Sequence, residues 1–307
     1  MATTNNLTTT YAGEFAGKYV SAALLSGKTL AEGNITIKPN VKFKEVMKKV
    51  STDDIVKDAS CDFDATSTLT LTERILTPEE FQVNLQLCKK DFRSDWDAIS
   101  MGYSAFDNLP PSFSDFLIAH VADKVAQRME NNIWSGTNAN AGQFDGFTTT
   151  LTADGDVNDV AAGAVTSANV ITELGKIADA VPSAVYGSED LYIYVSNNIY
   201  RAYVRALGGF ATNVGAAGTD AKGTQWFNGG ALTFDGINIV MASGLANNTA
   251  VAAEKSNLFF GTGLMSDQNE VKVIDMADID GSQNVRVVMR FTAGIQHAIG
   301  SDIVLYS

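Results

Sequence analysis

The fold is decided by LTLTERILTPEEFQVNLQLCKKDFRSDWDAISMG, residues 69–102, together with PPSFSDFLIAHVADKVAQRMENNIWSG, residues 110–136. Apolar and polar side chains alternate over 69–75 and again over 81–88, which predicts two half-buried strands with Pro78 in the turn between them. The apolar positions are Leu69, Leu71 and Ile75 in the first run, and Phe81, Val83, Leu85 and Leu87 in the second. The stretch contains no recognisable catalytic centre, so we expect a framework that presents surfaces.

A long amphipathic helix is predicted over 112–135, preceded by a short helix with Phe92, Trp96 and Ile99 on one side. Ser112 and Asp115 fit a capping box at the start of the long helix, and Gly136 is placed to end it. Its apolar stripe consists of Leu117, Val121, Val125, Met129 and Ile133, widened by Phe113, Phe116 and Ala122. At the helical rise, this helix spans about 33 Å, enough to brace a whole domain.

Composition predicts a globular protein rather than a disordered one, with 45% hydrophobic and 19% charged residues in a chain of 307. The net charge of -13 opposes binding to nucleic-acid phosphate unless the lysines lie on one face. A lysine cluster occurs in KPNVKFKEVMKK, and we interpret it as a solvated strand face or a contact with another acidic subunit. Its members are Lys38, Lys42, Lys44, Lys48 and Lys49.

The N-terminus lacks the pattern of a signal peptide, and no uncharged run is apolar enough for a membrane span. Cys61 and Cys88 allow one disulfide but do not require it, so a reducing compartment is the default expectation. We therefore expect a soluble chain that is made in the cytoplasm.

The rest of the chain predicts a flexible arm over residues 1 to about 35, a strand within 40–50 and a long polar loop over 51–68. After the long helix, a second helix capped at Thr166 or Ser167 precedes a buried strand over 191–195 and a third helix that ends at Gly208. This order indicates an α/β subdomain. Asp235-Gly236 predicts a hairpin, and the Gly- and Ala-rich segment 209–230 predicts a loop.

No catalytic residue, cofactor site or metal site is predicted. His120 and His297 are the two histidines; neither has a partner at metal-binding or catalytic spacing, and no nucleotide-binding glycine motif occurs. Two acidic loops resemble calcium loops but lack the final glutamate, so we interpret them as solvated turns. Their members are Asp154, Asp156 and Asn158 in one loop, and Asp275, Asp278 and Asp280 in the other. The tyrosines at 192, 194, 200 and 203 favour packing over ligand binding.

The order of these elements resembles the major capsid proteins of tailed phages, which have the Hong Kong 97-type fold. The resemblance rests on the strand that leads into the short helix over 89–97, on the long helix ending WSGTN, and on YVSNNIYRAYVRAL followed by GGALTFDGINIVMAS. It implies an α+β fold with an N-terminal arm, an extended β loop, a peripheral domain with a long spine helix and an axial α/β domain.

The resemblance also implies domain boundaries. The arm would take 1–38 and the strand with its extended loop 39–75. The peripheral domain would take 76–150 and 268–307, with the spine helix at 112–135, and the axial domain 151–267. The arm is too short to contain the scaffolding segment of some relatives, so a separate scaffolding protein, or none, is expected.

The implied function is that of a virion protein that assembles in the host cytoplasm into pentamers and hexamers of an icosahedral shell. The shell would enclose double-stranded DNA without sequence-specific binding, with portal and decoration proteins as further partners and no membrane. The candidate inter-subunit contacts are Lys42, Lys44, Lys48, Lys49, Lys57, Asp58 and Phe63. Some relatives cross-link neighbouring chains through Lys and Asn, but no motif assigns that chemistry to Lys57.

Two other classes of protein are weaker alternatives. An extracellular structural or adhesive protein would need an export signal. An α/β hydrolase-like or aldolase-like enzyme would need convergent acid, base or nucleophile residues, and the sequence offers none beyond two histidines outside any catalytic motif.

Overall fold

The computed structural model describes residues 28–41, 43–52, 68–88, 111–207, 232–263 and 272–307, together with residues 56, 58, 59 and 61. Contacts divide the chain into two compact units, which are described separately. Among the described residues, the long-helix unit contains Glu80–Met129 and Gly263–Thr292. The sheet unit contains Gly27–Glu79, Glu130–Thr262 and Ala293–Ser307.

The sheet unit is built on a six-stranded mixed sheet with the strand order β5-β13-β9-β6-β8-β7. Its strands are β5 (Asn158–Val160), β6 (Leu191–Val195), β7 (Leu232–Phe234), β8 (Ile237–Met241), β9 (Ala250–Glu254) and β13 (Val304–Tyr306). The central strand β6 runs parallel to β8 and antiparallel to β9. Four of its five side chains are buried, which confirms the predicted buried strand.

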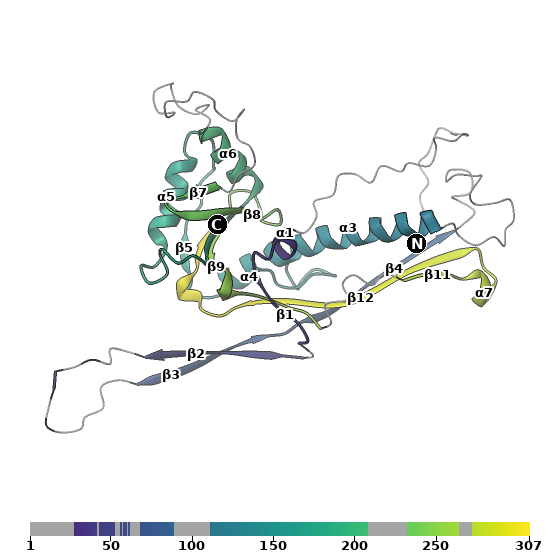
Figure 1. Ribbon diagram of the computed structural model, residues 1–307, viewed down its shortest axis with the longest axis horizontal. Coiled ribbons are helices and arrows are strands. Elements are labelled where there is room, and N and C mark those ends of the chain that lie inside the picture. The colour runs from purple at the N-terminus through teal and green to yellow at the C-terminus, as the bar shows by residue number, and fades with distance from the viewer. Residues whose placement is uncertain are drawn as a thin grey trace. The chain divides into compact units, whose positions relative to one another are not determined.

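Two helices, α5 (Val170–Ala180) and α6 (Asn197–Leu207), pack against this sheet (Figure 1). Their buried side chains form one core with those of the sheet. This core includes Leu174, Ile177, Ile199, Ala202, Ile193, Val195 and Val304. The predicted N-cap of α5 at Thr166 or Ser167 is wrong, because Asn169 is the N-cap residue. The Asn169 Oδ1 accepts hydrogen bonds from the backbone N–H and the hydroxyl of Thr166.

The turn between β7 and β8 has the predicted hairpin geometry. Asp235 and Gly236 have φ angles of 48° and 82°, so both lie in the left-handed region that a tight type I′ turn needs. β7 and β8 pair antiparallel on either side of them. The hairpin prediction is confirmed.

The long helix α3 (Pro111–Ser135) is confirmed. Val121, Met129 and Ile133 of the predicted stripe are buried, and Val125 is half-buried. The side chains of 111–119 are outside the description, so the capping box stays a prediction. The last turns of α3 belong to the sheet unit, where they meet α1 (Lys28–Ala31) and α4 (Phe147–Thr152).

Trp134 is fully buried at this meeting point. Its ring lies 5.4 Å from the ring of Phe147 and 5.0 Å from that of Tyr194, and its Nε1–H donates to Thr29 Oγ1 over 2.9 Å. Beside it, the buried carboxylate of Glu130 accepts hydrogen bonds from the backbone N–H and the hydroxyl of Thr29. These contacts fix α1 and the end of α3 to the central strand of the sheet.

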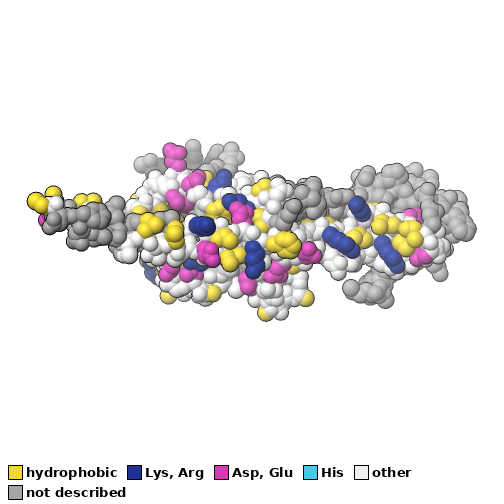
Figure 2. Space-filling view, turned by 90° about the horizontal axis from the view of Figure 1, so that it is seen from below, with side chains coloured by type: hydrophobic (Ala, Val, Ile, Leu, Met, Phe, Trp, Pro, Cys, Tyr) yellow, Lys and Arg dark blue, Asp and Glu magenta, His cyan; other side chains and the backbone are white. Residues whose placement is uncertain are grey.

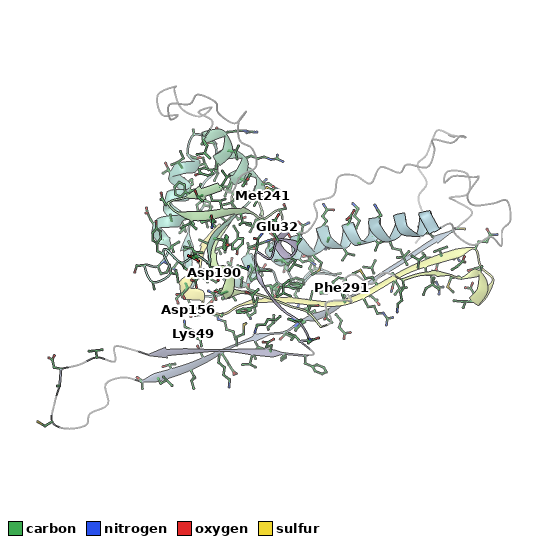
Figure 3. The ribbon with its side chains drawn as sticks, viewed as in Figure 1. Glu32, Lys49, Asp156, Asp190, Met241 and Phe291 are labelled. Carbon is green, nitrogen blue, oxygen red and sulfur yellow. The ribbon has the colours of Figure 1, made fainter. Side chains whose placement is uncertain are left out.

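A second sheet has the strand order β1-β10-β12-β11, and β4 also pairs with β12. Its strands are β1 (Thr36–Lys38), β4 (Glu79–Cys88), β10 (Leu258–Gly261), β11 (Lys272–Asp275) and β12 (Asn284–His297). In the long-helix unit, β12 buries every second residue from Val285 to Phe291, and Phe291 lies against Phe81 of β4 (Figure 3). The short helix α7 (Ala277–Asp280) links β11 to β12.

β2 (Glu45–Thr52) and β3 (Leu69–Leu76) form a separate two-stranded antiparallel ribbon. The predicted strand over 69–75 is therefore present, but its half-buried character is wrong, since six of its eight side chains are exposed. β3 and β4 do not pair with each other: β3 pairs with β2 and β4 with β12. Thr77 and Pro78 thus pass the chain from one sheet to another instead of closing a hairpin.

The contact units follow the chain differently from the predicted domain boundaries. Residues 28–38, assigned to the arm, contribute α1 and β1 to the sheet unit, with Thr29 and Ile35 buried. Residues 293–307, assigned to the peripheral domain, contribute β13 to the six-stranded sheet. The division into peripheral and axial domains stays a prediction. The predicted helix near Trp96 and the segment 209–230 lie outside the described residues.

Glu130 provides a test of the packing around α1. Burial raises the pKa of Glu130, because its hydrogen bonds from Thr29 and Trp134 do not compensate for lost solvation. Because the pKa is raised in the folded state, the free energy of unfolding falls as pH rises from the ordinary carboxyl pKa of 4.5 to the folded-state pKa. Above the folded-state pKa this loss of stability stays constant. Glu130→Gln removes this loss, and we expect its free energy of unfolding at pH 7 to equal or exceed that of the wild type.

The glutamine can still accept from the Thr29 N–H and donate to the Thr29 hydroxyl. Glu130→Ala leaves both Thr29 groups without their acceptor and should cost about 1–3 kcal/mol. Denaturant unfolding of both variants between pH 4 and 8 checks this. A glutamine variant as unstable as the alanine variant would contradict the role of burial.

Candidate assembly surface

The two faces of the β2–β3 ribbon differ in character. Directly opposite residues of an antiparallel pair share a face, and Val46 lies opposite Ile75, Lys48 opposite Glu73, and Thr52 opposite Leu69. We call the face that carries these pairs and the Val50–Leu71 pair the outer face. The opposite face, here the inner face, carries Glu45, Met47, Lys49, Thr70, Thr72, Arg74 and Leu76.

The outer face holds the apolar residues and is the one open to solvent. Leu69 is 63% exposed, Leu71 64%, Val46 45% and Ile75 40%. Figure 2 shows hydrophobic, basic and acidic side chains side by side on the surface of the molecule. On the inner face, by contrast, Glu45, Met47, Lys49 and Arg74 are half-buried and Leu76 is fully buried. In most antiparallel sheets the more apolar face packs on the core, whereas here the more apolar outer face is exposed.

The inner face is attached to the sheet unit near the end of β3. The Arg74 guanidinium donates to Asp154 Oδ2 over 2.5 Å, and the Gln296 side-chain amide donates to the carbonyl of Ile75 over 3.1 Å. Leu76 packs against Gly261, where an added Cβ would lie 2.7 Å from the leucine side chain. On the neighbouring strand, Glu45 forms an ion pair of 3.0 Å with Lys38 of β1.

Asp154 joins Arg74 to a buried histidine. His297 Nε2 lies 2.8 Å from Asp154 Oδ2, and the His297 side chain is fully buried. Burial lowers the pKa of His297 and the nearby Arg74 adds to this effect, while the hydrogen bond with Asp154 opposes it. For Asp154, burial raises the pKa, but the hydrogen bonds from His297, the Asp156 N–H and Arg74 outweigh burial and lower it overall. At neutral pH the cluster therefore holds one carboxylate, one guanidinium and one neutral imidazole.

The structure describes four of the seven residues predicted as inter-subunit contacts. Lys44, Lys48 and Asp58 are exposed and Lys49 is half-buried; Lys42, Lys57 and Phe63 lie outside the described residues. Lys48 and Lys49 are on opposite faces of the ribbon, and Lys38 is paired with Glu45. The lysine cluster therefore does not gather on one face, and the assembly role of its members stays a prediction.

Other candidate sites gain no support. Within the described ranges, no group of three or more His, Cys, Asp or Glu side chains is placed to hold a metal ion. The interpretation of Asp154 as a solvated turn residue is wrong, because its side chain is 13% exposed and bound to His297 and Arg74.

Tyr194 and Tyr203 are buried core residues, as predicted. Cys61 and Cys88 are both free thiols. None of the described helices combines the length and apolar character needed to cross a membrane.

No protein-family model and no curated protein sequence matches the chain. Solved structures do match, over nearly its whole length. The capsid of the native GTA particle is 14% identical with a TM-score of 0.62, covering 94% of this chain and 92% of its own. A structure from Mycobacterium phage Ogopogo is 12% identical with a TM-score of 0.63 and 94% coverage of both chains. The capsid of Myoviridae phage XM1 is 10% identical with a TM-score of 0.59, covering 95% and 94%.

The chain has the Hong Kong 97-type capsid fold. The predicted fold class is thereby confirmed.

Within this capsid fold, the sequence predicted the ribbon strands but not the cluster of Arg74, Asp154 and His297. Asp154 and His297 are 143 positions apart, and no local pattern joins them. The sequence did hold one signal for the outer face, because Glu73 interrupts the apolar positions of β3.

Asp154→Asn tests the attachment of the ribbon. The lowered pKa of Asp154 means that its contribution to stability is present above the ordinary carboxyl value of 3.8 and is lost as pH falls through the still lower folded value. The asparagine lacks the charge that Arg74 needs, so we expect a loss of about 1–3 kcal/mol at pH 7 and a flatter stability curve below pH 4. Asp156→Asn, at an exposed neighbouring position, is the matched control and should change neither. Equal losses in the two variants would contradict the assignment.

Proposed function

We propose that the chain is the major capsid protein of a tailed bacteriophage. Copies of it assemble into pentamers and hexamers of an icosahedral shell that encloses double-stranded DNA. The capsid fold supports this proposal, since the matched structures include the capsids of a GTA particle and of phage XM1. The protein is then a virion component with no catalytic role, assembled in the host cytoplasm.

The observation that carries the proposal is the exposed outer face of the ribbon. An isolated two-stranded ribbon is marginally stable in water, because it has no second layer to bury its apolar side chains. Here the leucines at 69 and 71 stay more than half exposed in the single chain. Covering a leucine side chain contributes about 1.5–3 kcal/mol, so a surface that covers this face gains substantial free energy. A second copy of the chain is the occupant that a shell supplies.

The distribution of charge favours enclosure of DNA without a dedicated binding site. The net charge of -13 repels phosphate, and the ribbon lysines at 48 and 49 are divided between two faces. The shell thus acts as a container whose subunits bind one another. The further partners proposed are portal and decoration proteins, with a separate scaffolding protein or none.

Substitution of the outer face tests the proposal. Leu69→Asp with Leu71→Asp places two charges on the exposed apolar surface, and we expect assembly to be lost while the fold of the subunit is kept. Surface substitutions usually change stability by less than about 0.5 kcal/mol, so unfolding curves should stay close to those of the wild type. Electron microscopy and light scattering measure the loss of particles.

The matched control is Thr70→Asp with Thr72→Asp, which adds the same two charges to exposed positions of the inner face. This variant should assemble. If the leucine variant forms particles as well as the wild type does, or if the purified wild type stays a monomer at high concentration in varied salt, the proposal is wrong.

Truncation of the N-terminus tests the role of the arm. Residues 1–26 lie outside the described residues, and we expect their deletion to leave a folded chain that no longer assembles. Deletion of residues 1–35 also removes Thr29 and Ile35, both buried, and should lower the unfolding temperature as well. Circular dichroism melting and electron microscopy separate the two effects. Normal particles from the shorter deletion would refute an assembly role for the arm.

A further inference from the structure

The outer half of β3 forms no side-chain hydrogen bond or ion pair with the rest of the sheet unit among the residues that the structure describes. The five residues of β3 from Leu69 to Glu73 are all exposed. The innermost residues are held: the carbonyl of Ile75 accepts from Gln296, and Leu76 is buried against Gly261. Arg74 is the outermost residue of β3 with a side-chain contact to the sheet unit among the described residues. The strand projects about 16 Å beyond it at the rise of a β-strand.

This geometry makes Arg74 a pivot. A small change of angle at the last fixed point of a rod displaces its free end in proportion to the length beyond that point. Leu69 and Leu71 lie on that free length, so their position depends on how firmly Arg74 is held. Three further attachments lie at the base of the ribbon: the Ile75 carbonyl and Leu76 on β3, and the Glu45–Lys38 ion pair on β2. Arg74 lies farther along the ribbon than these contacts, so it acts on the direction of the free end with the longest lever.

The Asp154 carboxylate that binds Arg74 is also held by two other groups of the sheet unit. Asp154 Oδ1 accepts the N–H of Asp156 over 3.2 Å, and Oδ2 accepts from His297. Gly300 makes room for this carboxylate, since an added Cβ would lie 2.3 Å from Oδ2. Figure 3 labels Asp156 in the same turn. A carboxylate oriented in this way binds a guanidinium with little further loss of side-chain entropy.

His297 orients the carboxylate without competing for its charge. The neutral imidazole donates its Nε2–H to Asp154, which leaves the full negative charge for Arg74. His297 is itself immobile, because it is fully buried at the end of β12 and pairs with Leu258 of β10. The three residues come from three distant parts of the chain and converge under the base of the ribbon.

We infer that Arg74, Asp154 and His297 are positioning residues that set the angle at which the β2–β3 ribbon leaves the rest of the sheet unit. The angle determines which surface of a neighbouring copy the outer face meets. This second statement rests on the proposed function, whereas the first concerns the single chain.

Distances within the dilute, unassembled chain test the inference. Spin labels at Thr70→Cys on β3 and Asp179→Cys on α5 report the direction of the ribbon, with Cys61→Ser and Cys88→Ser removing the native thiols. Both labelled positions are exposed and belong to the sheet unit. Pulsed electron paramagnetic resonance should give one narrow distance distribution in the wild-type background.

Arg74→Ala should replace this narrow distribution with a broad one, and Arg74→Lys should restore most of the narrow component because it keeps a cation. His297→Gln keeps a donor toward Asp154 and should stay closer to the wild type than His297→Ala. The matched control is Glu73→Ala, which removes a charge from the adjacent residue on the outer face and should leave the distribution narrow. The inference fails if Arg74→Ala keeps the wild-type width, or if Glu73→Ala broadens it equally.

The result is independent of the proposed function. A chain that never assembles but shows the narrow distribution, lost in Arg74→Ala, retains the positioning role and refutes the capsid proposal. A chain that assembles with an equally broad distribution before and after the Arg74 substitution retains the capsid proposal and refutes the positioning role. Particle yield by electron microscopy, measured on the same variants, separates these cases.

Discussion

The sheet unit depends on the burial of one indole ring. Four elements meet at Trp134: it belongs to α3, packs against Phe147 of α4 and Tyr194 of β6, and donates to Thr29 of α1. Its carbonyl accepts the hydroxyl of Thr148, and the next residue, Ser135, donates to the carbonyl of Gly244. A large aromatic side chain with a satisfied N–H contributes both apolar area and a fixed orientation. The end of the long helix therefore has one defined position against the sheet.

The ribbon shows the opposite use of apolar residues. In the core, aliphatic and aromatic side chains from α5, α6 and the central strands are covered on all sides. On β3, leucines of the same type stay in water, although β3 is paired with β2 over its whole length. Backbone pairing without a second layer does not stabilise such a ribbon. The single chain thus leaves an apolar surface uncovered, which is the observation behind the proposed contact with a second copy.

Local patterns predicted what local forces determine. The tight turn at Asp235-Gly236, the strand at 191–195 and the long helix each follow from the conformational preferences and periodicity of a few adjacent residues, and each is present. The burial of β3 was predicted wrongly, because alternation shows that a strand has two different faces but not which face is covered. The contacts of Asp154 were missed for a related reason: Arg74 and His297 reach it from positions 80 and 143 residues away. Only the folded chain brings these three side chains together.

Charge and apolar area act against each other when copies associate. Each subunit carries a net charge of -13, so association brings like charges together, and salt screens this repulsion over about 10 Å at moderate ionic strength. The apolar contact is short-ranged and is not weakened by screening. It must therefore act only once two subunits are already correctly placed. If copies associate through the outer face as proposed, a ribbon of defined direction reduces the number of orientations in which the contact forms, so the Asp154 cluster and the exposed leucines would serve the same interface.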